Sequence, residues 1–146
     1  MTTMLSARGL MKSFGAVTAA DDVNIEVPTG QRVSLIGSNG AGKTTFVNMV
    51  TGYLKPDAGT IALDGKEITG LGPRRITRLG VARSFQIPQL ALDMTALDNM
   101  LVAAACNDGE LSFWKPARSP ERRARAMALL ERFDLAAHAQ RKVSEL

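Results

Sequence analysis

Apolar and polar residues alternate in two stretches near the N-terminus, and this alternation predicts half-buried strands at residues 4–11 and 22–27. It is clearest in VNIEV, which ends the second stretch. A Pro-Thr-Gly turn follows, and the apolar run after it predicts a compact strand at residues 33–36. Later, TIALDGKEI predicts a strand, a tight Asp-Gly turn and a short second strand, and GVARSFQ predicts a further strand at residues 80–86.

Glycines, prolines and capping side chains mark the helix boundaries. A helix over about residues 42–50 ends near Gly52, and a brief helix over residues 73–79 begins at Pro73 and is closed by Gly80. The order of elements is therefore strands, one strand–loop–helix unit, further strands and a helical end. This order is typical of an α/β or α+β fold with a helical appendix.

Two helices make up the helical end. Thr95 lies three residues before Asp98, a capping-box-like start for a helix through about Cys106. Ser119 as N-cap and Pro120 at the first helical position begin the second helix. An apolar stripe follows at helical spacing: Ala126, Leu129, Leu130 and Phe133. We interpret this stripe as core rather than as a groove for a partner.

Length and composition fit one globular domain: the chain has 146 residues, 45% of them apolar. The sequence contains no run of about 18 apolar residues, so no membrane span is predicted. The N-terminal sequence MTTMLSARGL lacks the pattern of a signal peptide. Cys106 is the single cysteine, which excludes an internal disulfide and suits a reducing cytosol. We expect Cys106 to be a small buried side chain.

The net charge is mildly positive, +4 from 18 basic and 14 acidic residues. The arginine clusters at residues 74–75 and 122–125 could bind nucleic acid or acidic lipid, but a solvated helix face and a loop explain them more simply. Aromatic residues are few and are not interleaved with these arginines, so no base-stacking platform is visible. No nucleic-acid partner is expected.

Candidate chemistry is concentrated in GSNGAGKT, residues 37–44, which fits the G-x-x-x-x-G-K-[ST] pattern of a phosphate-binding loop between a strand and a helix. Its glycines let the backbone approach an anion closely, and successive N–H groups at the helix N-terminus converge on phosphate oxygens. Lys43 places a cation on the terminal phosphates, Thr44 offers its hydroxyl to Mg²⁺, and Thr45 bonds another phosphate. A glycine-rich turn without a ligand is the alternative, but it leaves the lysine and threonine unexplained. The predicted binding residues of the loop are Gly37, Ser38, Asn39, Gly40, Ala41, Gly42, Lys43, Thr44 and Thr45.

Over nearly its whole length the sequence resembles ATP-binding-cassette (ABC) ATPases: GSNGAGKTT is similar to their phosphate-binding loop, and TGYLKPDAGTIALDGKEI to the strand pair that follows it. The resemblance implies an α/β P-loop NTPase fold of the ABC ATPase type, with an N-terminal antiparallel β subdomain, the start of a helical subdomain, and a core sheet that is incomplete in this chain. It places a nucleotide-binding core at residues 1–90 and a helical subdomain, truncated before the signature motif, at residues 91–146.

The resemblance also implies roles for two residues outside the loop. Phe14, in KSFGAVTAADDV, matches the aromatic residue that stacks on adenine, although it could also be an ordinary apolar residue at a strand end. Gln86, in GVARSFQ, matches the glutamine whose amide contacts Mg²⁺ and the attacking water, although such a residue could also be a surface glutamine. The implied cofactors are ATP and Mg²⁺.

The final residues, RKVSEL, match the approach to the signature motif, which begins Leu-Ser-Gly-Gly-Gln or a near variant, and Leu146 stands at its first leucine. We therefore expect a chain without the signature motif, the acidic strand, the catalytic glutamate and the switch histidine; His138 falls too early to be that histidine and is interpreted as a surface residue. Such a chain should bind nucleotide without hydrolysing it alone. The resemblance also implies that the strand at residues 33–36 lacks neighbouring strands in this chain. We therefore expect a rearranged sheet, a dimer or swapped assembly, or a fragment of a longer protein.

GVARSFQIPQL and MTALDNMLVAA are similar to the subfamily that powers uptake of branched-chain and other hydrophobic amino acids. This likeness implies the ATP-binding subunit of an importer. It would act peripherally at the cytoplasmic face of the inner membrane, with transmembrane permease subunits and a second ATP-binding subunit arranged head to tail. The alternatives are a non-transport ABC ATPase of DNA repair or translation, another P-loop phosphotransferase, and a module that only senses ATP.

Overall fold

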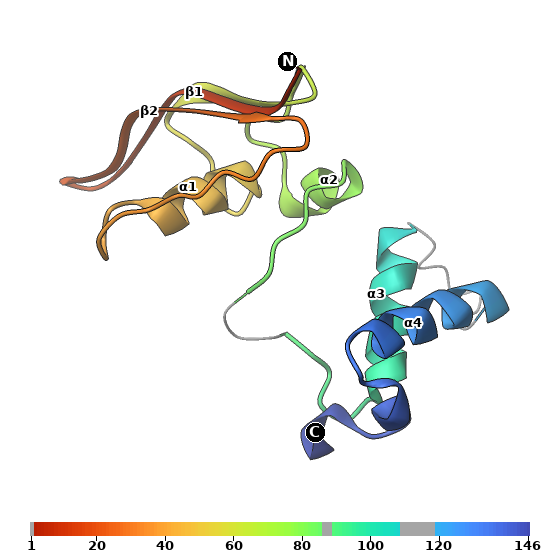
Figure 1. Cartoon of the computed structure of the whole chain (residues 1–146). Helices are drawn as coiled ribbons and strands as arrows, with labels where there is room; N and C mark the ends of the chain where they lie inside the picture. The colour runs from red at the N-terminus through yellow and green to blue at the C-terminus, as the bar shows by residue number, and fades with distance from the viewer. Residues whose placement is uncertain (1, 86–88, 109–118) are drawn as a thin grey trace. The chain divides into compact units, whose positions relative to one another are not determined.

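The computed structural model describes residues 2–85, 89–108 and 119–146. The chain divides into two compact units, Met1–Arg83 and Ser84–Leu146, both of which are drawn in Figure 1. Each unit has its own hydrophobic core.

A four-stranded antiparallel sheet forms the frame of the first unit. Its strands are β1 (Thr3–Phe14), β2 (Val17–Pro28), β3 (Ala58–Leu63) and β4 (Lys66–Glu67), in the order β2-β1-β3-β4. The predicted pair of strands around the Asp64–Gly65 turn is confirmed.

The first two strands are longer than the sequence pattern predicts, because they form one hairpin that continues through residues 12–21. The pairing register of this hairpin shifts at several points between Ala7 and Ser13. Asp22 also adopts a left-handed conformation, with φ 45°. Each shift inserts an extra residue into one of the two strands, and the alternation on which the sequence prediction relied breaks in that strand. Between Lys12 and Ser13 the extra residue is in β2, so the alternation of β1 continues from Lys12 to Phe14.

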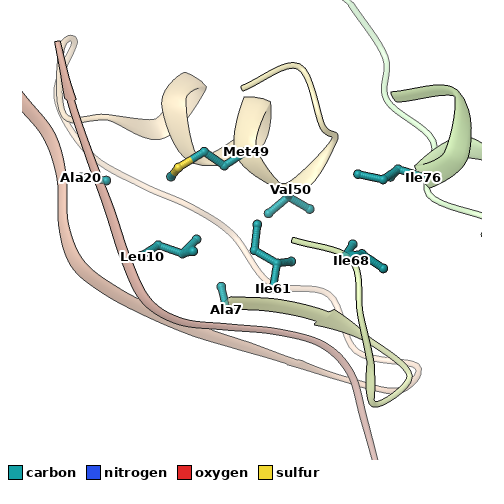
Figure 2. Close-up of a cluster of buried hydrophobic side chains, with 8 residues drawn as sticks. All are labelled: Ala7, Leu10, Ala20, Met49, Val50, Ile61, Ile68 and Ile76. Carbon is teal, nitrogen blue, oxygen red and sulfur yellow. The ribbon is translucent and has the colours of Figure 1, made fainter. Parts of the chain in front are cut away.

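Two helices pack on this sheet. Helix α1 (Lys43–Val50) and helix α2 (Pro73–Arg78) begin and end close to the predicted positions, and Gly52 and Gly80 follow them with φ 76° and 97°. Figure 2 shows the side chains of α1 turned toward those of the sheet. The buried cluster consists of Ala7, Leu10, Ala20, Met49, Val50, Ile61, Ile68 and Ile76.

The strand predictions at residues 33–36 and 80–86 were wrong for the residues that the structure describes. Residues 31–38 and 81–85 are not in strands, because no segment of the described chain pairs with them. The apolar run that predicted the first strand is instead accessible: Val33 is 51% exposed, Leu35 43% and Ile36 91%. A strand needs a hydrogen-bonded neighbour as well as apolar side chains. Residues 33–36 are therefore the part of the chain where the core sheet is incomplete, as the resemblance implied.

The second unit is helical. It contains α3 (Ala96–Asn107), α4 (Pro120–Arg132) and two 3₁₀ turns, η1 (Ala136–His138) and η2 (Val143–Glu145). Both predicted caps are confirmed: Thr95 accepts from the Asp98 amide at 3.0 Å, and Ser119 accepts from the Arg122 amide at 3.2 Å. The core of the unit consists of Ala96, Leu97, Leu101, Ala126, Leu130 and Ala139.

Four side chains of this unit are placed differently from expectation. Within the apolar stripe of α4, Ala126 and Leu130 are buried but Leu129 and Phe133 are exposed, because α4 ends at Arg132 and only one side of it faces α3. Cys106 is exposed rather than buried, since α3 is apolar around most of its circumference and turns this position outward. Within η1, His138 is half-buried, not a surface residue.

The C-terminal residues are hydrogen-bonded to the segment that leads into α3. Thr95 and Lys142 form an isolated antiparallel bridge. The flanking backbone bonds run from the amides of Ala96, Leu97, Val143 and Ser144 to the carbonyls of Arg141, Ala139, Met94 and Leu92 at 2.9–3.1 Å. The described part of the chain contains no helix with the length and apolarity needed to span a membrane.

Candidate functional site

The glycine-rich loop, residues 37–45, is a tight turn that runs directly into α1. Gly40 and Gly42 adopt left-handed conformations, with φ 83° and 79°, and Gly42 is the N-cap of the helix without a side-chain cap. Among the described residues no acceptor lies within hydrogen-bond reach of the amides of Gly42 and the next three residues. These amides and the helix dipole make the N-terminus of α1 a suitable place for an anion.

The side chain of Lys43 is hydrogen-bonded to the start of the same loop. Its ammonium group donates to the carbonyl oxygens of Gly37 at 2.7 Å and Ser38 at 2.6 Å. Because an ammonium group has three hydrogens, these two bonds leave one donor for a phosphate oxygen. The lysine thus joins the two ends of the loop and keeps its charge beside the open amides.

The loop glycines differ in what they contribute. A Cβ atom at Gly42 would lie 2.1 Å from the carbonyl oxygen of Ala19 in β2, whereas one at Gly40 would meet nothing within 4 Å. At Gly37 it would lie 3.2 Å from the Cβ of Ala41. The sequence interpretation assigned all three glycines to the approach of an anion. For Gly42 the structure gives a second reason why this position requires glycine: a side chain would collide with the backbone of β2.

An open hollow of about 100 Å³ lies between β2, the glycine-rich loop and α1. Its lining is mostly apolar and includes two of the exposed residues of the segment 31–38, so it does not suit a phosphate group. The lining residues are Ala19, Ala20, Val23, Ile25, Leu35, Ile36, Ala41, Gly42, Lys43 and Phe46.

Phe14 ends β1 at the tip of the hairpin, and its side chain is 51% exposed. It pairs with Val17, and Ala19, which touches Gly42, lies two residues further, about 7 Å along the strand. The ring therefore lies at the same end of the sheet as the glycine-rich loop. This is the arrangement that a bound nucleotide would need, with its base and its phosphates contacting different parts of one edge.

The remaining predicted site residues differ in whether the structure describes them and in how exposed they are. Gln86 lies outside the described residues. Ser38, Asn39, Ala41 and Thr44 are exposed, and Thr45 is half-buried. In the described part of the chain no three His, Cys, Asp or Glu side chains gather as metal ligands. The Thr44 hydroxyl alone would fit Mg²⁺ only if phosphate oxygens and water completed its octahedral shell.

Sequence reasoning missed an ion pair beside Phe14. Lys12 Nζ lies 2.6 Å from Asp57 Oδ1 and 5.7 Å from the centre of the Phe14 ring. Lys12 could have been noticed, because it stands two residues before Phe14 and so shares its face of the strand. No local pattern indicates Asp57, which is 45 residues away.

Arg83 links the segment before Gln86 to α1. Its guanidinium donates to Asn48 Oδ1 at 2.5 Å and lies 5.7 Å from the centre of the Tyr53 ring. Sequence reasoning also missed this contact.

The family profile described as ABC transporter matches residues 20–146. The high-affinity branched-chain amino acid transport ATP-binding protein LivG of Escherichia coli (strain K12) is 43% identical over 150 residues, which cover 98% of this chain and 59% of LivG. The ADP conformation of MJ1267, an ATP-binding cassette of an ABC transporter, superposes with a TM-score of 0.84 at 34% identity, covering 100% of this chain and 59% of MJ1267. A dimeric post-hydrolysis state of the ATP-binding cassette MJ0796, bound to ADP and Pi, superposes with a TM-score of 0.76 at 25% identity over 98% of this chain and 63% of MJ0796.

The present chain thus spans about three fifths of the length of these relatives. Its fold is that of the N-terminal part of an ABC ATPase cassette. By both its sequence and its fold, the chain belongs to the ABC transporter family.

Proposed function

We propose that the glycine-rich loop binds the phosphates of ATP. One observation carries the proposal: α1 begins at Lys43 with open amides, directly after a left-handed Gly42, and with the lysine ammonium fixed beside them. This combination offers both directed hydrogen bonds and positive charge to a polyphosphate. The description of MJ1267 in an ADP conformation supports the same reading.

For the other predicted residues, the match to the ABC ATPase motifs supports the following roles in the complex. Phe14 stacks on the adenine base. Thr44 would contribute its hydroxyl to Mg²⁺, and the amide of Gln86 would contact the same ion and orient the attacking water for hydrolysis in the intact protein. A bound Mg²⁺ would supply neutralisation of the charge on the transferred phosphoryl group.

We propose further that the intact protein is the ATP-binding subunit of an importer for branched-chain or other hydrophobic amino acids. The name of the E. coli relative supports this substrate class, and the dimeric description of MJ0796 supports pairing with a second ATP-binding subunit. Such a subunit works with transmembrane permease subunits at the cytoplasmic face of the membrane.

Titration of a fluorescent ATP analogue tests nucleotide binding. We expect Lys43→Ala to weaken affinity about tenfold or more, because a charge-assisted contact to phosphate contributes about 1.5–3 kcal/mol. Lys66→Ala removes an exposed lysine of the same unit, in β4, and serves as the matched control that keeps wild-type affinity. Equal affinity of the Lys43→Ala variant and the wild type would refute the proposal.

A further inference from the structure

The ion pair of Lys12 and Asp57 is fixed to β1 on both sides of the lysine. Lys12 Nζ lies 2.6 Å from Asp57 Oδ1, and the Lys12 side chain is only 15% exposed. Asp57 Oδ2 accepts from the Ser13 amide at 2.8 Å, and the Asp57 amide donates to the Met11 carbonyl at 2.9 Å. The carboxylate therefore binds the residues immediately before and after Lys12 as well as Lys12 itself.

This carboxylate stays ionised under ordinary conditions. The hydrogen bond from Lys12, followed by that from the Ser13 amide, holds the pKa of Asp57 below its ordinary value. A charged Asp57 keeps the ammonium group in one place relative to the strand. The surface pair of Arg8 and Glu26 on the same hairpin differs, because both side chains are more than half exposed.

The position of the ammonium group matters because of what lies beside it. Lys12 and Phe14 are two residues apart on β1, so their side chains leave the same face of the strand. Nζ lies over the Phe14 ring at 5.7 Å from its centre, within the range of a cation–π interaction. The cation thus covers one face of a ring that is otherwise 51% exposed at a hairpin tip.

We propose that Lys12, anchored by Asp57, is a positioning residue for the purine base: it holds the Phe14 ring in one orientation and leaves the opposite ring face for stacking. The inference rests on the proposed function, since it presupposes that Phe14 stacks on adenine. A ring already held in its binding orientation loses less conformational freedom when the base arrives, which strengthens binding of the base but not of the phosphates.

Calorimetric titrations of the full chain with ATP and with inorganic tripolyphosphate separate these two contributions. Lys12→Met keeps the aliphatic stem and removes the charge, and we expect it to raise the Kd for ATP about two- to fivefold while leaving the Kd for tripolyphosphate unchanged. Asp57→Asn should act in the same direction, and Lys12→Arg should restore ATP affinity. Arg8→Met, which removes a paired cation from the same strand, is the matched control and should bind both ligands as the wild type does.

The outcomes are distinguishable. Wild-type ATP affinity in the Lys12→Met variant would overturn the inference, as would an equal loss of affinity for both ligands, which would indicate a general structural role. Phe14→Ala tests the premise: if it binds ATP as tightly as the wild type, the stacking role fails and the inference fails with it. If the wild-type chain binds neither ligand, the proposed function itself is refuted.

Discussion

At the scale of single residues, the glycines of the glycine-rich loop are required for two different reasons: a left-handed backbone conformation and close contact with the sheet. Gly40 and Gly42 have nearly the same left-handed φ, 83° and 79°. Only Gly42 also touches another element, the carbonyl of Ala19 in β2. The pattern G-x-x-x-x-G-K-[ST] is explained by the contacts of its glycines with the ligand, but its second glycine, Gly42, also lets the loop approach the sheet closely.

Alanine substitutions separate the two constraints. Gly40→Ala adds only the strain of a left-handed alanine, about 1 kcal/mol, since its Cβ meets nothing within 4 Å. Gly42→Ala adds a Cβ that would lie 2.1 Å from a backbone oxygen, and we expect a loss of about 3 kcal/mol. Urea unfolding followed by circular dichroism measures both. Similar losses for the two variants would show that the contact with Ala19 is relieved at little cost.

At the scale of elements, an ionic cluster joins the end of α3 to the start of α4. Asp108 Oδ2 accepts from Arg122 Nε at 3.1 Å and from Arg125 at 3.0 Å, and the Arg122 side chain is only 5% exposed. The hydrogen bond from Arg122 is the main reason that the pKa of Asp108 lies below its ordinary value; partial burial opposes it, and Arg125 assists. The cluster therefore favours the packed helix pair while Asp108 is ionised.

From this cluster we predict that the second unit loses stability at acidic pH. Because the pKa of Asp108 is lower in the folded than in the unfolded chain, its contribution is complete above the unfolded pKa, about 4, and is lost as the pH falls through the folded pKa. Asp108→Asn should therefore lower the melting temperature at pH 7, and the difference from the wild type should shrink below about pH 4.

Thermal melts between pH 2 and pH 7 measure this effect. Asp93→Asn, at an exposed aspartate of the same unit, is the control and should leave the melting temperature unchanged. A difference between the Asp108→Asn variant and the wild type that stays constant over the whole pH range would contradict the electrostatic origin.

Elements defined by neighbouring residues were predicted well, and elements that need distant partners were not. Thr95 and Ser119 cap their helices as expected, because a cap depends on residues two or three positions away. Residues 33–36 have the composition of a strand, but their pairing depends on another segment. The same limit explains why Asp57 was missed. Cys106 ends the unbroken apolar run at residues 100–106 of α3, which gave no basis for deciding that this side chain faces outward.

At the scale of the whole molecule, residues 33–36 combine exposed apolar side chains with a backbone that is not paired in a sheet. Val33, Leu35 and Ile36 are 43–91% exposed, and residues 31–38 pair with no other described segment. Accessible backbone groups next to apolar side chains form a template for pairing with a second chain.

We therefore expect the 146-residue chain to self-associate in a concentration-dependent way. Ile36→Lys should shift sedimentation toward the monomer, because a charge on the 91% exposed side chain disfavours strand pairing. Phe133→Lys alters another exposed apolar residue, 73% exposed and next to a helix end, and serves as the control. If the two substitutions have the same effect, association reflects general hydrophobicity rather than pairing of residues 31–38.

The bonds from Lys43 to its own loop also bear on how fast a ligand can be captured. Two carbonyl contacts at 2.6 and 2.7 Å hold the loop around its cation by bonds within the protein itself. The entropic penalty of arranging that receptor is thus met when the chain folds, and an incoming polyphosphate encounters a preorganised surface. Capture should then be limited by diffusion and ionic strength rather than by a slow rearrangement of the protein.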